Sequence, residues 1–148
     1  MIADQWCITS WRARPGSFVS LMTLYESNFV RLGWLVKDLA SLSAANVSRV
    51  DSDCDLHLII VERMRYTSVF RLTYQFEQAG SVVCDPDLTI CVYHDAKLAE
   101  VRGFTGFVRH PHMARLQSQL KRELDQRWTH NMMLNKWLEY CAERGHRF

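Results

Sequence analysis

The sequence predicts an α+β domain: a four-stranded antiparallel meander sheet with an N-terminal helix and a C-terminal helix or helices packed on one face. Two periodicities carry this prediction. Apolar side chains recur every three or four residues from Phe18 to Leu39 and again over Thr129–Arg144, the spacing of one helix face. Over Tyr66–Glu77 apolar and polar side chains alternate, as in a strand with one buried face. The connections between strand segments are too short for crossover helices, so neighbouring strands are expected to pair antiparallel.

The N-terminal part divides into a leader and a helix. Residues 1–16 show no clear period and end in a Pro-Gly pair, which predicts a poorly ordered leader. A single α+β domain over residues 17–148 then begins with a helix near Ser17, whose hydroxyl is able to cap the first turn. A chain of 148 residues can bury a sizeable core without disulfides or metals.

A polar connector is predicted over Ser41–Asp55. Asp51, Asp53 and Asp55 alternate near its end, a pattern found in calcium-binding loops. The glycine and the closing glutamate of an EF-hand loop are missing at the required offsets. We therefore interpret this stretch as a solvated loop.

Four strands are predicted after the connector, and helical segments follow them. The strands are Leu56–Glu62, Tyr66–Glu77, Leu88–Tyr93 and Leu98–Arg102, with a loop over Gln78–Asp87 and another over Gly103–Pro111. Met113–Trp128 carries a thin leucine stripe among charges, which predicts either a separate helix or the front of one long helix. Gly145 suits the position just after a helix, where a positive φ is needed.

The composition excludes several classes of protein. The net charge is only +2, so nucleic acid is not favoured as a partner, and attraction to an anionic membrane is not expected. The sequence has no apolar stretch long enough to span a bilayer and no signal peptide, which predicts a cytoplasmic protein without a membrane partner. Five scattered cysteines without a C-x-x-C pair argue against a disulfide framework and a zinc site, so we interpret Cys91 and Cys141 as core thiols.

Glu62, Arg65 and Tyr66 are the first group of candidate binding residues. They cluster around the predicted first hairpin turn. An arginine fork beside a tyrosine hydroxyl is able to orient a carboxylate or a phosphate, with the glutamate supporting it. The alternative is an exposed ion pair between Glu62 and Arg65 that spans the turn.

Tyr93, His94 and Asp95, followed by Glu100, form the second group. One hairpin here offers an imidazole for acid–base chemistry, two carboxylates and a phenol. Neighbours on an extended strand point to opposite faces, so His94 and Asp95 cooperate only if the turn rotates one of them. The alternative is a structural histidine beside an aspartate that bonds the backbone of the turn.

Other constellations carry less specific signals. His110 and His112 flank a proline as a metal-binding pair would, and His94 or His130 would have to complete the set, but no third ligand stands at a fixed spacing. We therefore predict no metal and no cofactor. Basic residues between Arg109 and Arg127 form a stripe beside Trp128, which is typical of an RNA-binding helix, but Glu123 and Asp125 interrupt it. The sequence contains no recognised nucleophile or phosphate-loop motif.

Several stretches form an ordered set that covers nearly all of the chain after its leader. They are Tyr25-Glu26-Ser27-Asn28-Phe29, Val61-Glu62 through Arg65-Tyr66-Thr67, Tyr93-His94-Asp95-Ala96 with Ala99-Glu100-Val101, Asn131, and Trp137-Leu138-Glu139-Tyr140-Cys141. In their order and spacing these stretches resemble the YqiB-like family of small bacterial proteins of unknown function. The resemblance implies no activity, but it selects polar positions and adds Asn131 to the candidate site. His110 and His112 depart from the family pattern.

These observations support three hypotheses about function. The first is a non-enzymatic binding or regulatory module whose turn residues recognise a small anionic ligand or an acidic protein segment. The second is a small hydrolase-like enzyme with His94 as general base, oriented by Glu62 or Glu100. The third is a protein–protein interaction module that uses the uncovered sheet face or the tryptophans of the leader, Trp6 and Trp11.

Overall fold

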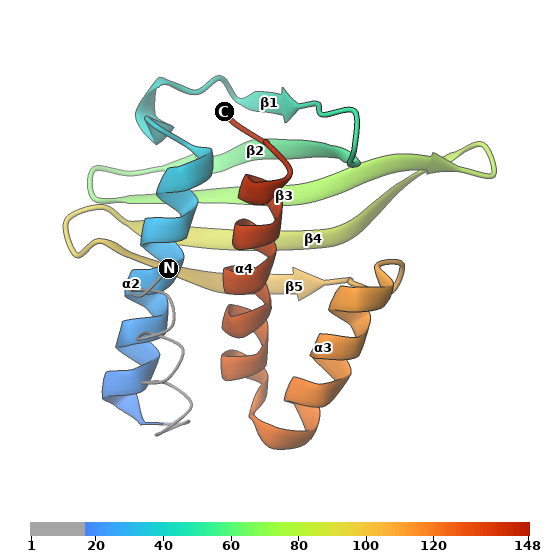
Figure 1. The fold of residues 1–148 in the computed structure, drawn as a ribbon. Coiled ribbons are helices and arrows are strands. Elements are labelled where there is room, and N and C mark those ends of the chain that lie inside the picture. Colours follow the sequence, from blue (N-terminus) through green and yellow to red (C-terminus); the bar gives the residue numbers. More distant parts are fainter. Residues whose placement is uncertain (1–16) are drawn as a thin grey trace.

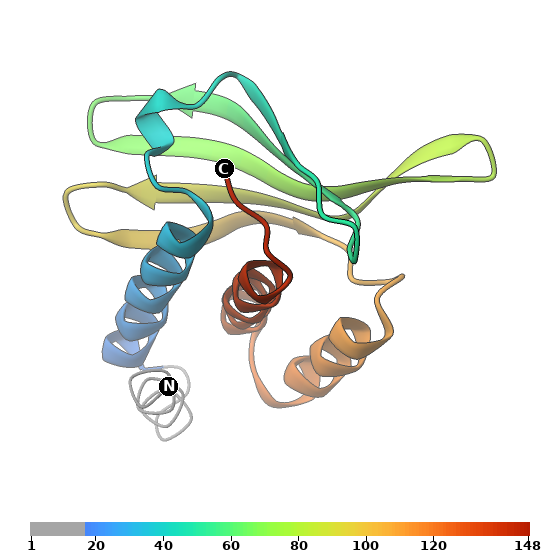
Figure 2. The same cartoon turned by 45° about the horizontal axis from the view of Figure 1, so that its top comes forward.

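The computed structural model describes residues 17–148, and the predicted leader lies outside the described residues. The architecture is α+β, as predicted, in two layers. One antiparallel sheet has the helices α2, α3 and α4 on one of its faces, and among the described residues no helix covers its other face (Figures 1 and 2). The strands follow the order β1-β2-β3-β4-β5, so the sheet is a meander.

The predicted N-terminal helix is α2, Phe18–Leu35. Ser17 caps it, because its hydroxyl oxygen accepts a hydrogen bond of 3.1 Å from the N–H of Ser20. The helix ends before the predicted limit at Leu39, and a short 3-10 turn, η1, follows at Leu39–Ser41. The carboxylate of Asp38 caps this turn by accepting from the N–H of Ala40 at 3.1 Å.

The sheet has five strands, so the prediction of four was wrong. The additional strand is β1, Ala45–Ser48, inside the predicted polar connector. It pairs antiparallel with β2, Asp55–Arg63, with Val47 opposite His57. Four residues of mixed polarity carry no alternating signal, and a strand this short at a sheet edge is stabilised by the pairing itself.

The third and fourth strands are longer than predicted. β3 spans Thr67–Gln78 and β4 spans Ser81–Tyr93, so most of the predicted loop over Gln78–Asp87 is strand. The two strands join at Ala79-Gly80, where both residues have positive φ, 53° and 79°. This hairpin projects beyond the rest of the sheet (Figure 1). Aspartate and proline in the first half of β4 hid the strand, since both residues are typical of loops.

A register shift accompanies those residues. Thr73 pairs with Asp87 and Gln75 with Cys84, so Asp85 and Pro86 form a bulge in β4. The last strand, β5, spans Leu98–Thr105 and pairs with β4 alone.

The C-terminal segments are two helices, which resolves the alternative left open by the sequence. They are α3, Pro111–Glu123, and α4, Gln126–Glu143. Leu124 and Asp125 separate them, and Asp125 caps α4 by accepting from the N–H of Trp128 at 3.0 Å. Among residues 17–148, no helix combines the length and the apolar character that crossing a bilayer requires.

The core lies between the sheet and α2 and α4. The helix-facing positions of the strands are fully buried, and so is the side chain of Trp137 on α4. These strand positions are Leu56, Leu58, Phe70, Leu72, Leu88 and Ile90. The C-terminal tail is also held in place, since the N–H of Phe148 donates to the carbonyl of Leu35 at the end of α2 at 2.7 Å.

Candidate functional site

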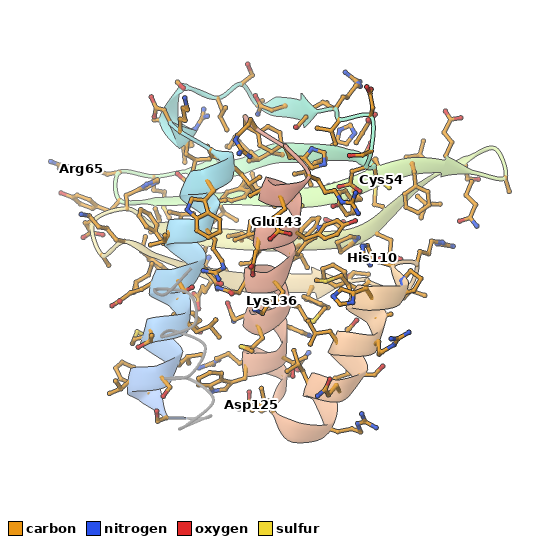
Figure 3. The ribbon with its side chains drawn as sticks, viewed as in Figure 1. Cys54, Arg65, His110, Asp125, Lys136 and Glu143 are labelled. Atoms are coloured by element: carbon orange, nitrogen blue, oxygen red, sulfur yellow. The ribbon has the colours of Figure 1, made fainter. Side chains whose placement is uncertain are left out.

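The two predicted groups of site residues lie at the same end of the sheet, in the β2–β3 and β4–β5 turns. A backbone hydrogen bond of 2.9 Å from the N–H of His94 to the carbonyl of Tyr66 joins the turns. The imidazole Nε2 of His94 lies 2.8 Å from the Ser68 hydroxyl. Figure 3 shows Arg65 at this end, with its side chain directed away from the sheet. The fold therefore brings Tyr66 and His94 together, although no local pattern relates them.

The first turn is an exposed surface. The Arg65 guanidinium carbon lies 5.2 Å from the centre of the Tyr66 ring, a cation–π contact, and Tyr66 is 53% exposed. Glu62 is exposed and lies opposite Val69, after a register shift in β2. Among the described residues, no ion pair joins Glu62 to Arg65. Arg65 therefore stacks on the neighbouring ring instead of spanning the turn to the glutamate.

Tyr93 and Glu100 form a pair of their own. The Tyr93 hydroxyl donates to Glu100 Oε1 at 2.5 Å and accepts from Arg102 at 3.4 Å. The hydrogen bond to Glu100, reinforced by burial, raises the pKa of Tyr93 to about 12. Burial and the same carboxylate raise the pKa of Tyr25 on α2 to about 12. Glu100 thus holds two protonated tyrosines, and in the described structure no hydrogen bond joins it to His94.

Asp95 and Asn131 have local structural roles. The Asp95 carboxylate accepts from the N–H of Ala96 at 2.9 Å, which is the backbone contact expected of an aspartate in a turn. Asn131 on α4 is 1% exposed, whereas Arg65 is exposed. Its Oδ1 accepts from the N–H of Val101 at 3.0 Å.

Asn131 and Asn28 together satisfy the free edge of β5. Asn28 Nδ2 donates to the carbonyl of Ala99 at 3.3 Å and to Asn131 Oδ1 at 3.3 Å. Side chains from α2 and α4 therefore bond the backbone groups of Ala99 and Val101 as a sixth strand would. These bonds protect this part of the edge from pairing with another chain.

A pocket of about 370 Å³ lies beside His94. Its walls come from the last turns of α2, from η1 and from the end of β4. The apolar lining residues are Phe29, Leu32, Val36, Leu39 and Val92, and the charged or ionisable ones are Lys37, Asp38 and His94. Of the predicted site residues, His94 is the one that lines this pocket.

A second polar cluster, which the sequence analysis missed, lies at the opposite end of the sheet. His146 is fully buried, with Nε2 3.0 Å from Asp53 Oδ2 and Nδ1 2.9 Å from the Ser48 hydroxyl. Tyr74 also donates to Asp53 Oδ2, at 2.7 Å. The Asp53 side chain is only 8% exposed, so the interpretation of this stretch as a solvated loop was wrong for Asp53.

The serine of this cluster is not arranged as a nucleophile. Ser48 is 6% exposed, and its oxygen accepts from the N–H of Arg147 at 3.1 Å. The hydrogen bonds among Ser48, His146 and Asp53 therefore hold the C-terminal tail against β1 and the β1–β2 connection. Only the alternating aspartates hinted at this cluster, because the partners are 93 and 98 residues apart in sequence.

The structure also shows where the histidine pair, the basic stripe beside Trp128 and the two core cysteines lie. Among the described residues, no group of three or more His, Cys, Asp or Glu side chains is arranged to hold a metal ion. His110 Nδ1 accepts from the N–H of Met113 at 3.2 Å and so caps α3. Trp128 is 3% exposed, which removes the aromatic surface that the basic stripe would need to stack a base. Cys91 and Cys141 are fully buried, as predicted.

Comparison of the sequence with known proteins places the chain in a family. Residues 31–147 match the model of a family described as protein of unknown function (DUF1249). The chain is 30% identical over 128 residues to uncharacterized protein YqiB of Escherichia coli strain K12. The aligned region covers 86% of this chain and 90% of the relative. YqiB of E. coli O6:H1 strain CFT073 and YqiB of E. coli O157:H7 give the same values. No solved structure matches the chain.

Proposed function

The chain belongs to the DUF1249 family, whose description names no activity, and we propose that it is a binding module for a small organic anion with an apolar body. The ligand would occupy the pocket beside His94. The observation that carries the proposal is the combination, in one cavity, of apolar walls with basic groups.

The size and lining of the pocket suit an apolar body. A volume of about 370 Å³ falls at the lower end of the range for small-molecule sites. Phe29 and Leu32 come from α2, Val36 is the residue that caps its C-terminus, and Val92 comes from the sheet. A hydrocarbon chain or a small ring placed against these side chains buries apolar surface away from water. Each Å² that is buried favours binding by about 25 cal/mol.

The charges of the pocket suit an anion. Asp38 is its carboxylate, and this group already accepts the N–H of Ala40 in capping η1. Lys37 is exposed and takes part in no ion pair within residues 17–148. Together with the imidazole of His94, its ammonium group provides donors for a carboxylate or a phosphate. Arg65, on the adjoining turn, adds positive charge that would attract such a ligand.

The same geometry favours binding over general-base catalysis. His94 is oriented by the hydroxyl of Ser68, which lies 2.8 Å from His94 Nε2, and not by a carboxylate. Glu100 Oε1 is engaged by Tyr93 at 2.5 Å. A general base needs a partner that stabilises its protonated form, and a neutral hydroxyl does this less well than a carboxylate.

A thermal-shift comparison of hexanoate, acetate and hexanamide tests the proposal. Hexanoate carries both the apolar body and the charge, whereas each of the other compounds lacks one of them. At a hundred times its Kd, a ligand stabilises the native state by about 2.7 kcal/mol, which raises Tm measurably. We expect a rise with hexanoate and little change with the other two.

Variants of the pocket complete the test. Gly33 lines the pocket, and a Cβ added there meets no atom within 4 Å, so we expect Gly33→Leu to fold and to direct its longer side chain into the cavity. It should abolish the effect of hexanoate, and Lys37→Met should weaken it. Lys97→Met removes another exposed lysine, which lies in the β4–β5 turn and does not line the pocket, and serves as the control. An equal hexanoate shift in wild type and Gly33→Leu would refute the proposal.

A further inference from the structure

A second concave site lies at the other end of the sheet from the pocket beside His94. It is a groove of about 420 Å³ between the β1–β2 connection, the projecting β3–β4 hairpin and the β5–α3 loop. Figure 3 shows Cys54 and His110 at this end and Arg65 at the opposite end. Cys54 and His110 both line the groove. The groove is therefore a separate site.

One wall of the groove presents a fixed carboxylate. Asp53 Oδ2 receives the Tyr74 hydroxyl at 2.7 Å and His146 Nε2 at 3.0 Å. Because a carboxylate oxygen only accepts hydrogen bonds, His146 Nε2 carries the proton of this contact. With Oδ2 held in this way, the other carboxylate oxygen is left to accept a donor from a ligand.

The β5–α3 loop supplies the donors. His110 Nδ1 accepts from the N–H of Met113 at 3.2 Å, so the proton of the neutral ring is on Nε2. Burial lowers the pKa of His110, which keeps the ring in this neutral donor form near pH 7. Arg109 lines the groove as well, its side chain is exposed, and within residues 17–148 its guanidinium forms no ion pair.

The loop that carries these donors is held by the bulge in β4. Asp85 accepts the N–H of Phe107 at 2.6 Å and the N–H of Arg109 at 3.0 Å, one on each carboxylate oxygen. Asp85 is thus occupied with the backbone, and Asp53 is the carboxylate in the groove with an oxygen to offer. The positions of Arg109 and His110 relative to β4 follow from this clamp.

We infer that the groove binds a small zwitterion of the free α-amino acid class. The ammonium group bonds the carboxylate of Asp53, and the ligand carboxylate bonds Arg109 and His110. The half-buried ring of Phe76 provides an apolar contact for the side chain of the ligand. A simple anion would be repelled by Asp53 and a simple cation by Arg109, so the pair of charges selects a molecule that carries both.

Isothermal titration with the full chain in the Gly33→Leu background tests this site apart from the pocket beside His94. The probes are the proteinogenic L-amino acids, and for each amino acid that binds, its amide and its N-acetyl derivative. The amide lacks the carboxylate and the N-acetyl derivative lacks the ammonium group. We expect at least one amino acid to bind and both of its derivatives to bind at least tenfold more weakly.

Two arginine variants give a matched comparison. Arg109→Gln removes the guanidinium and retains the backbone N–H that Asp85 accepts, so the loop should stay in place. It should weaken amino acid binding at least tenfold. Arg115→Gln, at an exposed position on α3, should leave binding unchanged. Equal affinity of the Gly33→Leu protein with and without Arg109→Gln, equal affinity for the amide, or no binding by any amino acid would each overturn the inference. These three outcomes do not depend on whether hexanoate binds the pocket beside His94, so failure of one proposal can be told from failure of the other.

Discussion

Replacing Asn131 with alanine separates a structural role from a ligand-binding role at this position. The sequence analysis placed Asn131 among the binding residues, whereas the structure buries it against the free edge of β5. The substitution removes the acceptor of two donors, the N–H of Val101 at 3.0 Å and Asn28 Nδ2 at 3.3 Å. It also removes a donor to the carbonyl of Arg127 at 2.9 Å.

The size of the effect follows from burial. Asn131 is 1% exposed and Asn28 is fully buried, so water cannot replace the lost acceptor without opening the structure. A buried donor left without a partner costs about 1–3 kcal/mol. Asn28 keeps its other acceptor, the carbonyl of Ala99, so most of the penalty falls on Val101. We expect the free energy of unfolding to fall by about 2–4 kcal/mol.

Urea unfolding measures this loss, and amide hydrogen exchange locates it. The Val101 amide should exchange much faster in Asn131→Ala than in wild type. Asn46→Ala is the control, because Asn46 bonds two carbonyls, those of Ser43 and Leu58, at 2.8 and 3.3 Å in a half-buried position on the edge strand. That variant should lose only about 0.5–1.5 kcal/mol and leave Val101 unaffected. A loss below about 1 kcal/mol in Asn131→Ala, with unchanged exchange at Val101, would refute the reasoning.

Three further predictions concern single residues. Gly33→Ala should raise the free energy of unfolding by about 0.5–1 kcal/mol in urea, because a Cβ there meets no atom within 4 Å and alanine favours the helix; a loss would contradict this. Gly106→Ala should lose about 2 kcal/mol or more, since the φ is +126° and its Cβ would lie 2.5 Å from Asp85 Oδ1; unchanged stability would rule out this close approach. The folded-state pKa of Tyr93 is raised from 10.0 to about 12, so the stability it contributes is complete below pH 10.0 and is lost as the pH rises through 12. Alkaline titration of tyrosinate absorbance should therefore show Glu100→Gln ionising a tyrosine at lower pH than wild type, and coinciding curves would count against the pair.

Elements with a strong local period could be predicted from the sequence. The cap at Ser17 and the stripe that follows it gave the start of α2, and the alternation after Tyr66 gave β3. β1 could not be found, because its four residues have no period and depend on pairing with β2. The start of β4 was hidden by Asp85 and Pro86, which read as a loop and prove to be a bulge inside a strand.

The candidate site shows the same division. Clusters such as Tyr93-His94-Asp95 are visible as neighbours in sequence, and the turns that carry them were predicted at the right places. Their partners were not visible. Tyr66 meets His94 only because β2–β3 and β4–β5 turn at the same end of one sheet.

The sequence by itself determined the fold class, the main helices, the central strands and the two exposed turns, because hydrophobic periodicity reports which face of each element is buried. Only the tertiary structure decided which polar side chains act together. Asn28 and Asn131 are 103 residues apart, and Asp53 and His146 are 93 apart. Such pairs carry no local signal, since their contact depends on how α2, α4 and the strands pack, and packing is set by the whole core at once. For this reason the pocket beside His94 and the groove beside Asp53 emerge from the fold and not from any motif.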